Sequence, residues 1–230
     1  MRARQRHINP KEAGSTCAYD TRFLSLADNT KVATWPDRGG VSNATQGTDA
    51  RRPTFYTNIQ GGNPSIRFFG AGQTWLGVPS FAAGVDHTSL CVAKFEYTAR
   101  AFNYAPILGG NANNIAPLAY YGTTTTALAG SYSISTGGSD TPVFDPTSAP
   151  WRVFTTARNN TGLSGYISNV GTKAGTLPAN NAATIVTIGS RTTLFYDNYL
   201  SSLIVWIPRI SQSLTNRYIQ SMAYSFKIPT

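Results

Sequence analysis

Short runs in which apolar and polar residues alternate recur along this chain, and they constrain its fold more than any other feature. The clearest is residues 88–100, where the even-numbered positions from Leu90 and the odd-numbered positions from Cys91 would lie on opposite faces of a strand. Alternation with a period of two is typical of β-strands. Shorter runs of strand character occupy residues 105–110, 118–123, 127–136, 151–159, 163–172, 183–191 and 199–208. Many short strands separated by turn signals predict an antiparallel all-β domain.

The composition also disfavours surface helices. Charged residues make up 13% of the 230 residues, against roughly 25% in ordinary globular chains. Glutamate occurs only at Glu12 and Glu96, although surface helices draw heavily on Glu and Lys. A β-sandwich of this length commonly forms one domain, and no internal linker divides the sequence.

One helical pattern follows the strands near the C-terminus. Residues 211–226 carry an apolar residue at every fourth position, which defines one face of a helix. These residues are Leu214, Tyr218, Met222 and Phe226. Ser211 or Ser213 can cap the start of the helix, and Pro229 follows its end. We therefore predict an all-β, antiparallel β-sandwich closed by one short C-terminal helix.

The beginning of the chain is polar and basic, and we predict an N-terminal arm over residues 1–16 ahead of a domain over residues 17–230. The net charge of +9 can steer a protein toward nucleic acid, anionic glycans or acidic protein surfaces. Three arginines would give binding a log–log salt slope of only about −2 to −3, and no aromatic residue lies among them. Nucleic acid is therefore not an expected partner. The cations of the arm are Arg2, Arg4, Arg6 and Lys11.

Targeting and metal signals are missing from the sequence. No apolar run follows the basic start, so we expect no signal peptide and synthesis in a host cytoplasm. No stretch approaches the ~20 apolar residues of a membrane span. Cys17 and Cys91 lie far apart, and in a reducing compartment they are expected to be buried thiols. Neither belongs to a Cys/His cluster, so we expect no metal and no cofactor.

Three parts of the chain follow one another in a characteristic order. They are residues 35–40 with 43–46 and 52–55, then residues 64–70, and then residues 188–228. The last part joins a glycine-containing strand, an Asp-containing turn, an apolar strand, a serine cap and a short helix. This order resembles the laminin-G-like, concanavalin A-like jelly-roll domains, especially those of bacteriophage and bacterial proteins. The resemblance extends over residues 18–228 and implies a jelly-roll sandwich.

The segment TWPDRGGVSNATQ, residues 34–46, could have either of two roles, which are binding a ligand and forming a structural turn. In the family that the chain resembles, the tryptophan packs in the core and the Asp and glycines shape the next turn. Asp side chains bond nearby backbone amides in such turns. We therefore expect a structural role for Trp35 and Asp37.

The sequence departs from that family where a metal or sugar site would be expected. Members usually read Phe-Asp-Gly-x-x-Asp after the second strand. Here Phe69 replaces the Asp, and Gln73 and Thr74 stand near the later acidic position. Calcium needs several oxygen ligands, usually including carboxylates, so the departure argues against a metal site.

The enzyme hypothesis has little support in the sequence. Glycanases related to this fold carry a Glu-x-Asp-x-x-Glu strand, because glycoside hydrolysis needs two carboxyl groups roughly 5–10 Å apart. Glu96 has no acidic residue two or four positions away, and His7 and His87 adjoin no Gly-x-Ser-x-Gly elbow. We predict that the chain is not an enzyme.

The first functional hypothesis is a structural protein of a virus particle, either a bacteriophage capsid decoration or a tail-associated subunit. A single sandwich with a basic arm and without an export signal fits this role. The cationic arm would anchor the domain to coat or tail subunits, and further copies of the chain would make a homo-oligomer. The protein would then reside in the virion.

The alternative hypothesis is a carbohydrate-binding or adhesion module that recognises cell-surface glycans. Such a site would need an aromatic platform together with Asn and Asp hydrogen-bonding groups. The two hypotheses are compatible, because a particle subunit can also bind sugar. The candidate glycan-binding residues are Trp75, Asn113, Asn114, Tyr120, Tyr121 and Tyr196.

Overall fold

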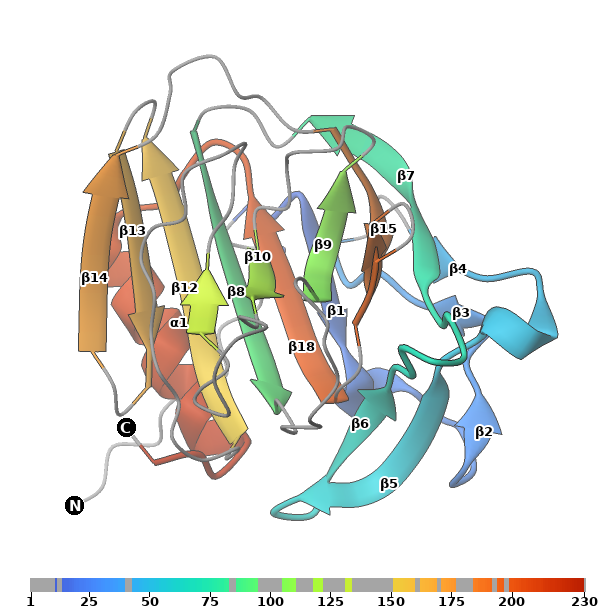
Figure 1. Cartoon of the computed structure of the whole chain (residues 1–230). Helices are drawn as coiled ribbons and strands as arrows, with labels where there is room; N and C mark the ends of the chain where they lie inside the picture. Colours follow the sequence, from blue (N-terminus) through green and yellow to red (C-terminus); the bar gives the residue numbers. More distant parts are fainter. Residues whose placement is uncertain are drawn as a thin grey trace.

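The computed structural model places the strands in two main antiparallel sheets that stack face to face (Figure 1). The described part of the chain comprises residue 11 and residues 14–39, 43–82, 86–94, 105–110, 118–121, 131–133, 151–159, 162–168, 171–176, 184–191, 194–196 and 199–229. Within it, the prediction of an antiparallel β-sandwich with one C-terminal helix is confirmed.

The larger sheet has nine described strands, in the order β14-β13-β12-β8-β18-β6-β5-β2, with β1 also paired to β18. Their bounds are β1 (Cys17–Asp20), β2 (Thr30–Lys31), β5 (Thr54–Gln60), β6 (Asn63–Arg67), β8 (Asp86–Lys94), β12 (Trp151–Asn159), β13 (Gly162–Ile167), β14 (Gly171–Thr176) and β18 (Tyr199–Trp206).

The second sheet has seven described strands in the order β11-β10-β9-β15-β7-β4-β3, and β16 and β17 form a separate pair. Their bounds are β3 (Thr34–Trp35), β4 (Ala44–Thr45), β7 (Leu76–Ala82), β9 (Ala105–Gly110), β10 (Leu118–Tyr121), β11 (Ser131–Ser133), β15 (Thr184–Ile188), β16 (Ser190–Arg191) and β17 (Leu194–Phe195). Short 3-10 helices lie at Thr21–Phe23 and Asp49–Arg51.

Strand β18 lies at the centre of the larger sheet and is buried on both faces. Leu203 and Val205 pack between the two sheets, whereas Ile204 and Trp206 pack on the outer face of the larger sheet. A strand that is covered on both faces reads as a continuous apolar run. The structure therefore confirms the strand character predicted over residues 199–208, and the helix supplies the cover on the outer face of β18.

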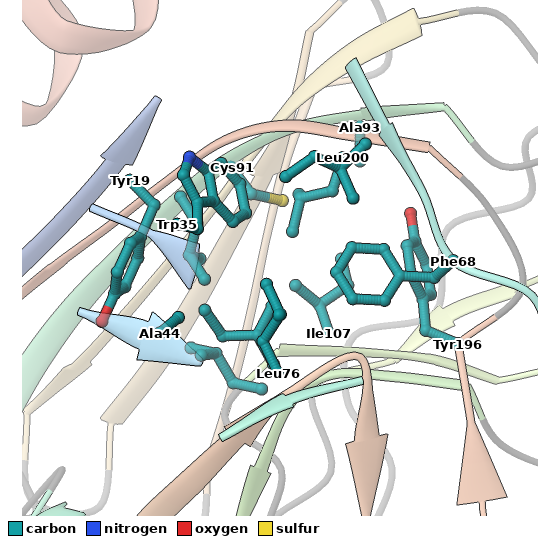
Figure 2. Close-up of a cluster of buried hydrophobic side chains, with 14 of the residues drawn as sticks. Tyr19, Trp35, Ala44, Phe68, Leu76, Cys91, Ala93, Ile107, Tyr196 and Leu200 are labelled. Atoms are coloured by element: carbon teal, nitrogen blue, oxygen red, sulfur yellow. The ribbon is translucent and has the colours of Figure 1, made fainter. Parts of the chain in front are cut away.

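The core between the sheets is rich in aromatic side chains (Figure 2). Trp35 is fully buried, and its ring centroid lies 5.4 Å from that of Tyr19. Phe68 and Tyr196 form a second buried pair, with centroids 5.8 Å apart. Each large side chain buried in this way stabilises the fold by about 1.5–3 kcal/mol.

The helix α1 (Gln212–Ser225) covers the outer face of the larger sheet. Of the two candidate caps, Ser211 is the one used, because its Oγ accepts the N–H of Leu214 at 3.3 Å. The ring of Tyr218 packs 4.7 Å from that of Trp206. The predicted helix and its apolar face are thus confirmed, although Leu214 is only partly buried.

The loop after β3 has the structural role expected of it. Asp37 is buried, and its Oδ1 accepts the N–H of Ala18 at 2.8 Å and the N–H of Gly39 at 2.7 Å. Asn43 Oδ1 in turn accepts the N–H of Asp37 at 3.0 Å. Because these bonds turn the Asp37 carboxylate into the protein, it holds the loop in place.

Both cysteines are free and buried, as the sequence predicts. Cys17 is paired with Val205 and Cys91 with Leu203, so β18 separates the two thiols. Burial raises the pKa of both thiols above the ordinary value. No helix in the described part of the chain is long and apolar enough to cross a membrane.

Candidate functional site

A polar groove lies between α1 and the outer face of the larger sheet near its β14 edge. Figure 1 shows α1 lying behind β12, β13 and β14. The groove has a volume of about 520 Å³, which is within the range of roughly 300–1,000 Å³ for small-molecule sites. Its lining comes from the strands through Thr155, Ala157, Ser164, Gly165, Tyr166 and Thr172, and from the helix through Gln212, Thr215, Asn216, Ile219 and Gln220.

The strand side of the groove follows from the register of the sheet. Thr155 of β12 is paired with Tyr166 of β13, and Tyr166 is paired with Thr172 of β14. On the other side of β12, Leu90 of β8 is paired with Thr155, and Leu90 packs under the helix. The outer face therefore changes from apolar at Leu90, near the centre of the sheet, to polar at Thr155 and Thr172 toward its β14 edge.

The helix side of the groove carries amides at a spacing of four residues. Gln212, Asn216 and Gln220 are all exposed and line the groove. Residues four apart lie on the same side of a helix. Gln212 donates from Nε2 to Asn216 Oδ1 at 2.8 Å, so these two amides are oriented relative to each other before any ligand arrives.

Two buried residues of the helix, Thr215 and Ile219, also line the groove. Thr215 is buried and donates from Oγ1 to the carbonyl of Ser211 at 3.0 Å, within the first turn of α1. Ile219 is also buried and packs in the cluster beneath the helix. The groove is thus built on two regular elements, and its amides project from a helix whose other side is packed.

The groove is electrically neutral over its described lining, since none of the lining residues is charged. The charge on β12 lies on the opposite face, where Arg158 is buried on the same side as Phe154. Burial lowers the pKa of Arg158. Hydroxyl and amide groups both donate and accept hydrogen bonds, so the groove suits an uncharged, polyhydroxylated ligand.

The described carboxylates have structural partners outside the groove. Asp20 pairs with Arg22, Asp49 with Arg52 at 2.8 Å, and Asp86 with Arg209 at 3.6 Å. Asp28 accepts the N–H of Thr57 at 2.7 Å. Among the described residues, no group of three or more His, Cys, Asp or Glu side chains is arranged to hold a metal ion.

The candidate glycan-binding residues from the sequence do not form this groove. Trp75 lies before β7, where its backbone N–H donates to Arg51 and its carbonyl accepts from Gln46 Nε2 at 3.3 Å. Tyr120 and Tyr121 belong to β10, in the other sheet. The side chains of Tyr120 and Tyr121, and the whole of Asn113 and Asn114, lie outside the described residues.

Tyr196 requires a correction. Its side chain is fully buried, packs against Phe68, and donates from its hydroxyl to the carbonyl of Tyr199 at 3.1 Å. Its backbone N–H donates to Gly189 at 2.8 Å. Tyr196 is therefore a core residue with no ring face to offer a glycan.

The predicted arm is described only near its end. Lys11 is exposed, and its carbonyl accepts the N–H of Gly14 at 3.1 Å. Thr16 donates its N–H to Val205 at 2.7 Å and accepts the N–H of Ile207 on Oγ1 at 3.0 Å. The arginines of the arm, Arg2, Arg4 and Arg6, lie outside the described residues.

Comparisons with known proteins show the fold. No family model matches the sequence, and no curated protein matches it. Among solved structures, the sialidase of Trypanosoma rangeli in a covalent complex with 2,3-difluorosialic acid matches 95% of this chain at 12% identity and a TM-score of 0.53. This chain spans about a third of that sialidase, 34% of its length.

A second solved structure matches over nearly its whole length. It is domain 4 of AbnA, a GH43 extracellular arabinanase from Geobacillus stearothermophilus, in complex with arabinotriose. The match covers 90% of this chain and 98% of that domain, at 15% identity and a TM-score of 0.52. The fold is therefore a β-sandwich of the jelly-roll, concanavalin A-like type that also occurs in glycoside-hydrolysing proteins.

These comparisons contradict the prediction that the chain is not an enzyme. Both neighbours are parts of proteins named as glycoside-hydrolysing enzymes. The prediction relied on one local motif, Glu-x-Asp-x-x-Glu, whereas carboxylates that are distant in sequence can meet in a folded site. The absence of that motif does not decide whether the chain is catalytic.

Proposed function

We propose that this chain is a carbohydrate-binding β-sandwich and that the groove between α1 and strands β12–β14 is its binding site. The observation that carries the proposal is the lining of the groove, in which neutral hydroxyl and amide groups surround the partly exposed Tyr166. Sugar hydroxyls need both donors and acceptors. An aromatic ring offers the apolar surface against which a sugar ring packs.

The arabinanase domain supports this proposal. It is similar in size, since 98% of it is matched, and its structure was determined with arabinotriose. At 15% identity the likeness concerns the fold, so a neutral glycan as the ligand of this chain is our proposal. It agrees with the alternative hypothesis from the sequence better than with the particle hypothesis.

The proposal concerns glycan binding, and whether the chain also hydrolyses the bound glycan is a separate question. Hydrolysis would need two carboxyl groups about 5–10 Å apart. The acids whose positions the structure does not describe are Glu12, Glu96, Asp140, Asp145 and Asp197. Release of reducing ends from each bound glycan therefore belongs in the same experiment.

The test is a screen of neutral and anionic oligosaccharides, including arabinotriose, followed by calorimetry on each hit with Gln220→Ala and Asn216→Ala. Both residues are exposed, so these changes leave the fold intact. Loss of one hydrogen bond worth about 1 kcal/mol should raise Kd by roughly fivefold.

Ser213→Ala is the matched control, because Ser213 is exposed on the same helix and does not line the groove. It should bind like the wild type. The proposal is wrong if no neutral glycan binds, or if Gln220→Ala and Asn216→Ala bind as tightly as the control.

The virus-particle role stays a prediction from the sequence. It depends on the basic arm, whose arginines lie outside the described residues, and neither structural neighbour bears on it. Partners among coat or tail subunits, a homo-oligomeric state and a location in the virion are proposals of the same kind. Copurification of the chain with particles, lost when residues 1–16 are deleted, would support them.

A further inference from the structure

Tyr224 exposes more of its side chain than any other large apolar residue in the described part of the chain. It is 71% exposed, whereas Phe23 is 49% and Ile59 37% exposed. Tyr224 lies near the end of α1, a helix whose other large apolar side chains are buried or partly buried. The packing of the helix therefore does not account for the position of this ring.

The position of Tyr224 continues the row of groove amides. Gln212, Asn216 and Gln220 line the groove at a spacing of four, and Tyr224 follows Gln220 at the same spacing without itself lining the groove. Helical side chains lean toward the N-terminus, so the direction expected for the Tyr224 side chain is toward the turn that carries Gln220. At 1.5 Å per residue, Tyr224 lies about 6 Å along the helix axis beyond Gln220.

The backbone that carries Tyr224 is held from outside the helix. Asn63 donates from Nδ2 to the carbonyl of Ser225 at 3.1 Å, and Gln60 donates from Nε2 to the carbonyl of Phe226 at 3.3 Å. Phe226 itself is fully buried. A ring on a fixed backbone loses little conformational freedom when a ligand packs on it.

We propose that Tyr224 forms an aromatic subsite beyond Gln220, so that the groove binds a linear neutral oligosaccharide along α1 and not a single sugar. The inference rests on the proposed function, since the amides of the groove hold one part of the glycan. The ring of Tyr224 then packs against a sugar unit farther along the chain. Short glycans that fill the groove do not reach it.

The test measures Kd by calorimetry across one neutral series that the screen identifies, from the monosaccharide to the pentasaccharide. The arabinose series is the first probe. Tyr224→Ala should weaken the binding of the longer members by roughly threefold to tenfold and leave the shortest bound member unchanged. Tyr224→Phe keeps the ring and should bind like the wild type.

The outcomes separate this inference from the proposed function. If Gln220→Ala weakens the binding of glycans of every length while Tyr224→Ala weakens none, the groove is supported as the binding site and the Tyr224 subsite is wrong. An equal loss at every length with Tyr224→Ala also contradicts the subsite. If no neutral series binds the wild type, both proposals fail.

Discussion

The carboxylate of Asp37 accepts the backbone N–H of Ala18 at 2.8 Å, and the carbonyl of Ala18 accepts the N–H of Arg38 at 2.7 Å. This reciprocal contact joins β1 to the loop after β3. Because the same carboxylate oxygen also binds Gly39, one buried charge organises both segments. It explains why a buried acidic residue occupies this loop.

Asp37→Ala should lower the free energy of unfolding by about 2–3 kcal/mol, since buried hydrogen bonds to a charged group are strong and their N–H donors would be left unpaired. Asp37→Asn keeps one acceptor oxygen and should lose less. Urea unfolding of both variants measures the difference. Asp49→Ala is the control, because Asp49 is 75% exposed in its pair with Arg52, and it should change stability by less than about 1 kcal/mol. Equal losses for Asp37→Ala and the control would contradict the prediction.

Gly109→Ala should prevent β9 from packing against β16. A Cβ at this position would lie within van der Waals overlap of the Ser190 carbonyl and 2.3 Å from Thr187 Oγ1. Since the first of these is a backbone atom, the strands themselves would have to move. We expect a loss of about 3 kcal/mol or more, or failure to fold. Gly47→Ala is the matched control, because nothing lies within 4 Å of its Cβ. Circular dichroism and thermal unfolding distinguish the two variants, and a folded Gly109→Ala with the stability of the control would contradict the prediction.

Stability should fall at alkaline pH. Burial raises the pKa of Cys17 and Cys91 above the ordinary value of 9.0, so above that pH the unfolded state ionises its thiols while the folded state keeps them protonated. For each thiol that is protonated in the folded state and ionised in the unfolded state, the free energy of unfolding falls by about 1.4 kcal/mol for every unit by which the pH rises. The stabilisation is fully present below pH 9 and is lost as the pH rises.

Urea unfolding between about pH 8 and pH 10 measures this slope. The double variant Cys17→Ala, Cys91→Ala should flatten it, with a residual slope from Tyr19, whose pKa burial also raises. Native protein should resist thiol alkylation until it unfolds. Rapid labelling of either cysteine in the native state would contradict its burial.

Ser211→Ala should lower the free energy of unfolding by about 1 kcal/mol, because it removes the side-chain acceptor for the Leu214 N–H. Ser213→Ala lies two residues away within the helix and should have an effect within about 0.5 kcal/mol. Thermal unfolding compares the two variants directly. Equal effects would mean that the cap does not hold the first turn, where Gln212 enters the groove.

Local patterns predict the regular elements well where one face or both faces are buried. The run 151–159 coincides with β12, and the run 105–110 coincides with β9. The helix predicted over residues 211–226 matches α1 with its serine cap, because capping and apolar spacing are both local signals.

The candidate site could not be predicted in the same way. It joins residues 155–172 with residues 212–220, and their meeting depends on how α1 lies across strands that are paired over long range. The spacing of the amides Gln212, Asn216 and Gln220 was visible in the sequence as the polar side of the helix. Tyr196 is predicted from the sequence to be an exposed glycan-binding residue because it lies between short strands. Its burial against Phe68 depends on a contact that is distant in sequence, so no local pattern could indicate it.

The pairing of β18 has a consequence for the order in which the protein can be built. Among the described strands of the larger sheet, β18 alone joins β8, β12, β13 and β14 on one side to β6, β5, β2 and β1 on the other. Ser202 of β18 donates to the carbonyl of Tyr19 across 183 residues. A nascent chain therefore holds two incomplete half-sheets with exposed edges until residue 206 has left the ribosome. A ribosome that stalls ahead of β18 leaves a product with edges open to other chains, and the last strand to be made is the one that closes the sheet.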